Sequence, residues 1–113
     1  ETDILEPIPQ DWRKKYFTKE DPAGKTWRLD SQLRNMISLA RLNFMDKFPM
    51  RGPFDVIFCR NAMIYFDKPT QETLVKRFYD LIAPGGYLFV GHSESLTGAN
   101  HSFKYIQPAI YQK

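Results

Sequence analysis

Polar side chains follow apolar runs at three places in the sequence, and their types suit the binding of a small polar ligand. They are Asn43 after 37–42, Arg60 and Asn61 after 54–59, and the stretch 91–95 after 87–90. Asn amides donate and accept hydrogen bonds, as the edge of a nucleoside requires. Ligands of open α/β sheets bind outside the carboxyl ends of the parallel strands. If the three runs are neighbouring strands, these groups converge on one crevice.

Each of these side chains also has an ordinary structural interpretation. An Asn at a strand end can bond to its own turn, and Phe44 can stack on a flat ring or belong to the core. A guanidinium directly after a buried strand requires an anionic or aromatic partner, which for Arg60 is either a ligand or one of Asp55 and Asp67. The phenol of Tyr65 can orient a carboxylate or a methyl donor in the crevice, or lie in water. The residue types alone leave both interpretations open.

The consecutive residues His92, Ser93 and Glu94 present the side chains of a serine hydrolase. Adjacent residues point in divergent directions, so these three cannot form a triad among themselves. The stretch also lacks the Gly-x-Ser-x-Gly elbow between a strand and a helix. We interpret it as a loop that lines the site or caps a following turn, and a hydrolase remains the alternative enzyme class.

The composition narrows the class of protein. The chain has 113 residues, 42% hydrophobic and 26% charged, which predicts one small globular domain. The net charge of +3 is spread along the chain, so nucleic-acid binding is not expected. No apolar run approaches the ~20 residues that span a bilayer. One cysteine fits a cytoplasmic protein, and one Cys with two His at 92 and 101 predicts no metal site.

The elements that position these residues follow from the apolar pattern. We predict strands at 37–42, 54–59 and 87–90, a helix from Thr70 that ends at 84–86, and a hairpin of 103–106 with 109–111. The run 54–59 suits a strand buried on both faces. A strand–helix–strand unit implies a parallel pair with a right-handed crossover. Since only one strong helix is available, one face of the sheet is expected to lack its cover.

The first thirty residues predict a smaller unit. Residues 12–17 suit a short helix or a strand, and the turn signal at 21–24 precedes a short strand at 26–29, so a small hairpin is expected. Asp30 or Ser31 is expected to cap a short helix that extends to Met36.

Residues 54–68 carry a specific resemblance. Their sequence, Phe-Asp-Val-Ile-Phe-Cys-Arg-Asn-Ala-Met-Ile-Tyr-Phe-Asp-Lys, resembles the signature of the CheR chemotaxis receptor methyltransferases, and the stretches 81–95, 12–17 and 39–44 continue the likeness. The resemblance implies an α/β fold, the C-terminal part of a class I (Rossmann-like) methyltransferase sheet with a small N-terminal β-hairpin subdomain. It assigns 1–30 to a partial β-subdomain and 31–113 to the C-terminal half of the S-adenosylmethionine-binding domain. The family's sheet has seven strands, of which the last is antiparallel, and this chain would include the third to the seventh.

The same resemblance implies the activity and the roles of the residues. A methyl group passes from S-adenosylmethionine to glutamate carboxylates of a methyl-accepting chemotaxis receptor, which leaves S-adenosylhomocysteine. Asn43 and Phe44 would contact the adenosine, Arg60 and Asn61 the cofactor, and Tyr65 the region of methyl transfer. A carboxylate is already ionised at neutral pH and needs little general base. Arg60 and Tyr65 would therefore act as positioning and electrostatic groups.

Several expectations concern what lies outside these residues. The family's first two strands, which contact the methionine and the ribose, are not in the chain, so we expect it to bind cofactor weakly or not at all by itself. An open sheet edge would favour domain-swapped dimers. Residues 14–29 resemble the subdomain that docks a receptor's C-terminal peptide in some members. The alternatives are a CheR-like enzyme of another signalling system and a non-catalytic peptide-binding module that acts through the hairpin around Trp27.

Overall fold

The computed structural model describes residues 5–23 and 26–113. The chain divides into two compact units, Glu1–Arg41 and Leu42–Lys113. The division between these compact units falls after Arg41. The domain boundary after residue 30 that the resemblance implies stays a prediction. Each unit has its own secondary structure, and each is described by itself.

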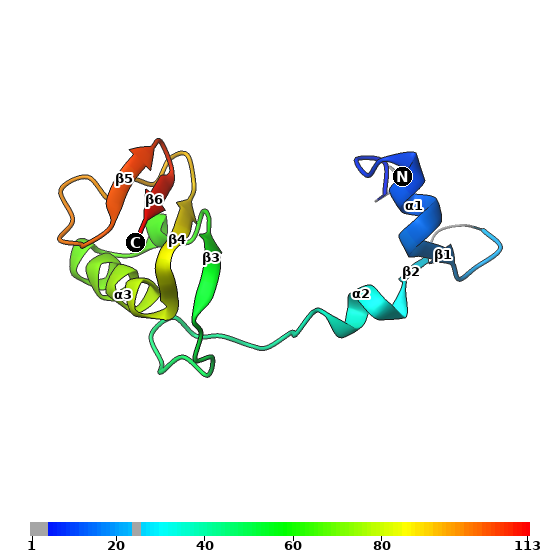
Figure 1. Cartoon of the computed structure of the whole chain (residues 1–113), viewed down its shortest axis with the longest axis horizontal. Coiled ribbons are helices and arrows are strands. Elements are labelled where there is room, and N and C mark those ends of the chain that lie inside the picture. The colour runs from blue at the N-terminus through cyan, green and yellow to red at the C-terminus, as the bar shows by residue number, and fades with distance from the viewer. Residues whose placement is uncertain (1–4, 24–25) are drawn as a thin grey trace. The chain divides into compact units, whose positions relative to one another are not determined.

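The first unit contains the expected hairpin. Helix α1 (Gln10–Tyr16) leads into β1 (Phe17–Lys19), which pairs antiparallel with β2 (Trp27–Leu29), and α2 (Ser31–Asn35) follows (Figure 1). The stretch 12–17 is thus mainly helical. Of the expected turn at 21–24, Gly24 lies outside the described residues. Asp30 caps α2 as predicted, because its carboxylate accepts a hydrogen bond of 2.8 Å from the N–H of Gln32.

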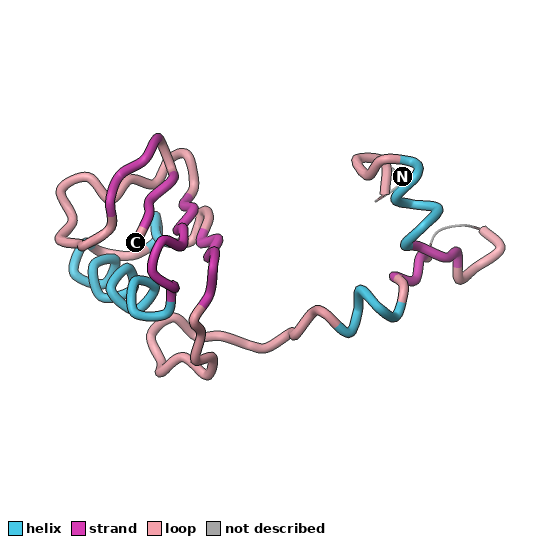
Figure 2. The backbone as a smooth tube through the Cα atoms, in the orientation of Figure 1, coloured by secondary structure: helices cyan, strands magenta, loops and turns pink. Residues whose placement is uncertain are grey.

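The second unit is a mixed four-stranded sheet with the strand order β3-β4-β6-β5. Strands β3 (Phe54–Cys59) and β4 (Ile82–Val90) are parallel, and α3 (Lys68–Leu81) connects them. The hairpin of β5 (Lys104–Gln107) and β6 (Ile110–Gln112) places β6 antiparallel beside β4. Figure 2 shows the helix along one side of this sheet. The predicted strand–helix–strand unit and the C-terminal hairpin are both confirmed.

Helix α3 supplies most of the cover of the sheet. It begins two residues before Thr70, because the carboxylate of Asp67 caps it through a 3.0 Å bond from the Thr70 N–H. Its buried side chains are Leu74, Val75 and Phe78, which lie on one face at helical spacing and join the core around the sheet.

Two predictions of local structure are wrong. Residues 37–42 form no strand, and Leu39 is 93% exposed. Alternation of apolar and polar residues does not by itself make a strand, because a strand also needs a neighbouring strand to pair with. No described residue pairs with 37–42. The residues 84–86 do not end the helix but lie inside β4, which starts at Ile82. The register of β4 against β3 shifts between Phe54 and Val56, so these residues form an irregular start to the strand.

The two faces of the sheet differ in their burial. On the α3 side, Leu88 is fully buried, but Phe58 on the opposite side is 70% exposed. Phe58 stacks on Phe89 of β4 with ring centroids 4.8 Å apart, and Val56 and Tyr87 pair next to them on the same exposed face. The prediction that 54–59 is buried on both faces is therefore wrong. The expectation that one face lacks its cover is confirmed for the described residues of this unit.

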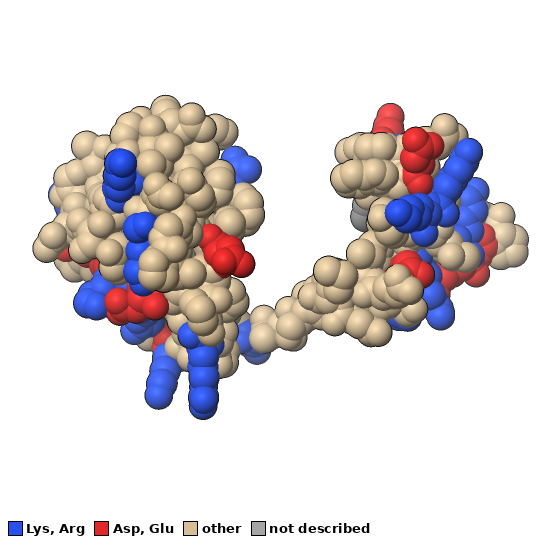
Figure 3. All heavy atoms as spheres, viewed as in Figure 1, with Lys and Arg blue, Asp and Glu red and all other residues tan. Residues whose placement is uncertain are grey.

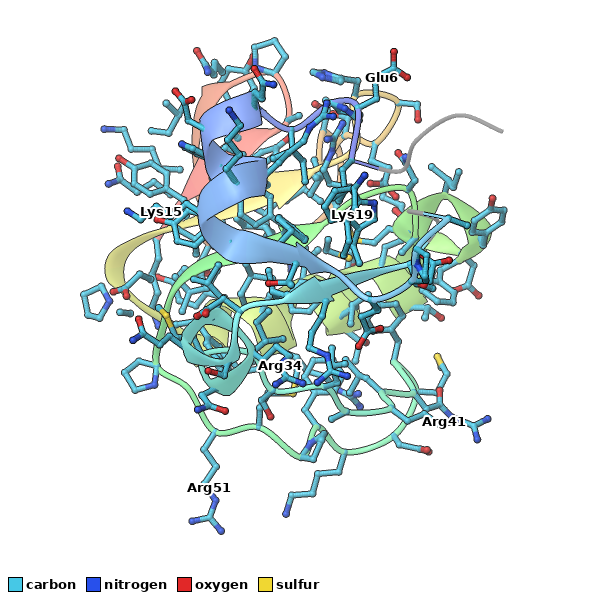
Figure 4. The ribbon with its side chains drawn as sticks, turned by 90° about the vertical axis from the view of Figure 1, so that its right-hand side faces the viewer. Glu6, Lys15, Lys19, Arg34, Arg41 and Arg51 are labelled. Atoms are coloured by element: carbon cyan, nitrogen blue, oxygen red, sulfur yellow. The ribbon has the colours of Figure 1, made fainter. Side chains whose placement is uncertain are left out.

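Charged side chains lie on the surfaces of both units. On the face drawn in Figure 3, the Lys and Arg side chains are interspersed with Asp and Glu. Lys15, Lys19 and Arg34 are exposed in the first unit, and Arg51 extends away from the ribbon (Figure 4). Among the described residues, no helix has both the length and the apolar character needed to cross a bilayer.

Candidate functional site

The loop after β3 and the loop after β4 meet at one buried carboxylate. Glu94, in the second loop, is only 7% exposed. Its Oε1 accepts hydrogen bonds from the N–H groups of Met63 at 2.7 Å and Ile64 at 3.2 Å. Its Oε2 accepts from the N–H groups of Asn61 at 2.9 Å and Gly91 at 2.6 Å. Four backbone donors from two loops are thus satisfied by one side chain.

These contacts determine the charge state of Glu94. Burial by itself would raise the pKa of this carboxyl, since it disfavours the charged form. The backbone N–H groups of Gly91, Asn61, Met63 and Ile64 outweigh that effect and lower the pKa of Glu94 below its ordinary value. The side chain is consequently an ionised acceptor at neutral pH, with no proton to give.

The two loops approach each other closely at Gly91. A Cβ atom added there would lie 2.4 Å from the Oδ1 of Asn61 and 2.8 Å from the Oε2 of Glu94. Any larger residue would therefore displace one of these side chains. Asn61 itself has a φ of +58°, a left-handed conformation that Asn adopts more readily than most residues. The position of the Asn61 side chain thus depends on the absence of a side chain at Gly91 and on the position of Glu94.

The predicted residues Arg60 and Tyr65 lie on either side of this bonded turn. Arg60 follows β3 and is exposed. Among the described residues its guanidinium has no hydrogen bond or ion pair, so pairs with Asp55 and Asp67 are not formed. Tyr65 ends the 3-10 helix η1 (Met63–Tyr65) and is 80% exposed. Both side chains are available to a ligand.

The predicted residues Asn43 and Phe44 lie in a separate loop of the same unit. The Oδ1 of Asn43 accepts a 3.0 Å bond from the N–H of Met45, so this Asn does satisfy its own turn. Its amide N–H₂ has no partner among the described residues. Phe44 packs against the core, edge-on to Phe66 at 6.1 Å and to Phe78 at 6.5 Å. The contact with Phe66 joins this loop to the segment that carries Tyr65.

Arg77 of α3 anchors the same loop, and no pattern in the sequence indicates this role. Its Nη1 donates to the carbonyl oxygens of Phe44 at 2.9 Å and Asp46 at 2.8 Å. Its guanidinium also lies 5.4 Å from the ring centre of Phe48. The position of the Asn43–Phe44 pair therefore depends on a side chain more than thirty residues away.

Cys59, at the end of β3, is buried and free. Burial, with a smaller contribution from the negative charge of Glu94, raises the pKa of its thiol to about 11. The thiol is therefore protonated at neutral pH and is not a nucleophile. Its place is structural, beside the loop that Glu94 binds.

The hydrolase alternative does not fit this geometry. Glu94 binds four backbone N–H groups, whereas His92 and Ser93 are exposed. His92 and Ser93 form no hydrogen bond with each other or with Glu94, so no chain of proton transfer connects the three. Residues 92–94 therefore belong to a loop, as the sequence predicted, and Glu94 anchors it to the loop after β3.

Three polar side chains of these loops have no protein partner in the described part of the chain and could bind a ligand. The amide of Asn43, the guanidinium of Arg60 and the phenol of Tyr65 are all without protein partners among the described residues. They offer a neutral donor, a cation suited to a carboxylate, and a donor–acceptor hydroxyl. Together with Asn61, these residues are among those that the resemblance assigns to S-adenosylmethionine, and that role stays a prediction.

The fold and the site together define a Rossmann-like α/β unit with its candidate ligand loops at the carboxyl ends of two parallel strands. Residues 1–111 match the family described as CheR methyltransferase, SAM binding domain. The chain belongs to this family.

Named relatives agree with the family. A probable chemotaxis protein methyltransferase of Rhizobium etli is 40% identical over 96% of this chain and 41% of its own length. The chemotaxis protein methyltransferase of Salmonella typhimurium is 38% identical over 91% of this chain and 36% of its own length. That of Borreliella burgdorferi is 46% identical over 72% of this chain and 29% of its own length. The chain thus spans about two fifths of the relatives' length, or less.

Proposed function

We propose that the protein containing this chain transfers a methyl group from S-adenosylmethionine to glutamate carboxylates of chemotaxis receptors. The observation that carries the proposal is the match of residues 1–111 to a SAM-binding methyltransferase domain. The relatives are named chemotaxis protein methyltransferases, which supports a receptor substrate. Transfer within another signalling system is the alternative, because it would use the same site.

The proposed reaction needs little acid–base chemistry from the protein. The cofactor supplies a methyl group activated by a positively charged sulfur. The glutamate is already a carboxylate at neutral pH, so no proton has to be removed. Arg60 would attract and orient this anion, and Tyr65 would fix one of its oxygens by a hydrogen bond. The exposure of both side chains supports this assignment.

Cofactor contact is assigned to a second group of residues. We assign Asn43 and Phe44 to the adenosine, and Arg60 and Asn61 to the rest of the cofactor. The unpartnered amide of Asn43 supports hydrogen bonding to a nucleoside. Phe44 is packed into the core, so only the part of its ring that remains accessible can contact the ligand.

Calorimetry with S-adenosylhomocysteine and a methyl-transfer assay test the proposal on the intact protein. The product should release methanol in mild base, as a glutamate methyl ester does and a methylated amine does not. Arg60→Gln should lower the rate of transfer about 100-fold by removing an electrostatic donor. Lys76→Gln is the control, since Lys76 pairs with Asp80 on the exposed side of α3. Peptide binding without S-adenosylhomocysteine binding would favour the non-catalytic module.

A further inference from the structure

The loop after β3, which contains the 3-10 helix η1, and the loop after β4 meet at Glu94. Its carboxylate accepts the N–H groups of Asn61, Met63 and Ile64 in the loop after β3, and that of Gly91 in its own loop. Each oxygen accepts two of the four bonds. Bonds to a charged acceptor are roughly twice as strong as bonds between neutral groups. The amides of Met63 and Ile64 begin the 3-10 helix η1 and have no partner within it, so the carboxylate caps this helix.

The bonded turn lies between the residues assigned to the cofactor and the substrate. Arg60 directly precedes the first bonded amide, at Asn61, and Tyr65 directly follows the last, at Ile64. Asn61 also holds a left-handed φ of +58°, a conformation that persists only where surrounding contacts favour it. A change at Glu94 therefore moves three site residues without touching any of their side chains.

We propose that Glu94 is a positioning residue of the methyltransferase site, whose carboxylate fixes the turn that presents Arg60, Asn61 and Tyr65 to the cofactor. The inference rests on the proposed function. Binding sites require their side chains within about 0.5 Å of the productive geometry, which exposed loops do not maintain unaided. The acceptor is buried and lies thirty residues or more from the turn in sequence, so it limits motions that local bonds would allow.

Glu94→Gln in the intact protein is the direct test. The amide keeps the shape of the side chain but presents an N–H₂ group to two of the four backbone donors, which repel it. We expect the dissociation constant of S-adenosylhomocysteine to rise at least tenfold, on the order of the loss found when an orienting partner of a site residue is removed. The control is Asp80→Asn, because Asp80 forms an exposed ion pair with Lys76 on α3, outside both loops. It should bind within twofold of the wild type.

Amide hydrogen exchange separates positioning from a general loss of stability. In Glu94→Gln, the exchange of the amides of 61–64 should be accelerated more than that of the amide of Leu88, which is fully buried in β4 and reports the loss of global stability. Equal acceleration at both places would overturn the proposal, since the residue would then support the fold as a whole. Unchanged cofactor affinity with fast exchange at 61–64 would overturn it as well.

Gly91→Ala is the second variant, and it decides the matter if Glu94→Gln does not fold. Its new Cβ would meet only the ends of the Asn61 and Glu94 side chains within 3.0 Å, so the fold can accommodate it by moving them. We expect weaker S-adenosylhomocysteine binding with intact protection at Leu88, and wild-type affinity would contradict the proposal. If the wild-type protein itself fails to bind S-adenosylhomocysteine, the proposed function is wrong. If it binds and both variants bind equally well, only the role of Glu94 is wrong.

Discussion

The N–H of Met63 donates a 2.7 Å hydrogen bond to the carboxylate of Glu94, a residue 31 positions further along the chain. This single contact joins the ends of two parallel strands, because Met63 belongs to the loop after β3 and Glu94 to the loop after β4. It makes the ionisation of one buried group a condition for the geometry of the candidate site.

The first prediction concerns acid stability. The pKa of Glu94 is lower in the folded state, so its contribution to stability is present above the ordinary glutamate pKa of about 4.3. The contribution is lost as the pH falls from there through the folded pKa. Urea unfolding between pH 7 and pH 3 should show this loss, and Glu94→Gln should be less stable at pH 7 by about 3 kcal/mol. The difference between the two proteins should shrink toward pH 3, and a constant difference would contradict the assignment.

The second prediction concerns Cys59. With its pKa raised to about 11, the thiol should react with a disulfide reagent at pH 8 at least ~100-fold more slowly in the folded protein than in urea. Because the charge of Glu94 contributes to this shift, Glu94→Gln should lower the pKa of the thiol and speed its reaction. Rapid labelling of the folded wild type would contradict this prediction, because it would show that the reagent reaches the thiol at the end of β3.

The third prediction concerns Arg77. Arg77→Met retains the apolar stem but removes the donors to Phe44 and Asp46, which leaves two carbonyl oxygens without this partner. We expect the free energy of unfolding to fall by about 1 to 3 kcal/mol. Lys76→Met is the matched control on the same helix, since its exposed pair with Asp80 contributes about 0.5 kcal/mol or less. Urea denaturation measures both, and equal effects would mean that Arg77 does not anchor the loop.

The fourth prediction compares the two faces of the sheet in the 113-residue chain. Leu88→Ala removes a fully buried side chain beneath α3 and should lower the free energy of unfolding by about 2 to 5 kcal/mol. Phe58→Thr loses mainly a ring contact with Phe89 on the exposed face and should cost about 1 kcal/mol. It should also reduce the binding of a hydrophobic dye. A cost as large as that of Leu88→Ala would mean that this face is covered.

Much of the local structure was predictable because its causes are local. The hairpin of β1 and β2, the cap at Asp30, the apolar face of α3 and the final hairpin follow from periodicity and turn chemistry within short windows. The candidate residues Arg60 and Asn61 were found the same way, as polar groups directly after an apolar run. Their roles toward a ligand stay predictions.

The failures have a shared cause. Residues 37–42 alternate like a strand but have no described strand beside them to pair with. Residues 54–59 are apolar enough to be buried on both faces of the sheet, but only one face is covered. Alternation describes what a segment can bury, whereas pairing and cover depend on other segments. The irregular start of β4 at Ile82 likewise depends on its register against β3.

By itself, the amino-acid sequence determined the order of helix and strands from residue 54 onward, the parallel pair and the positions of the polar groups that follow it. Only the tertiary structure decided that Glu94 anchors the loop after β3 and that Arg77 anchors the loop of Asn43 and Phe44. It also decided that the thiol of Cys59 lies close to Glu94. The physical reason is distance along the chain. A hydrogen bond between residues about thirty positions apart forms only when the core has brought their backbones together, and no short window of sequence contains both partners.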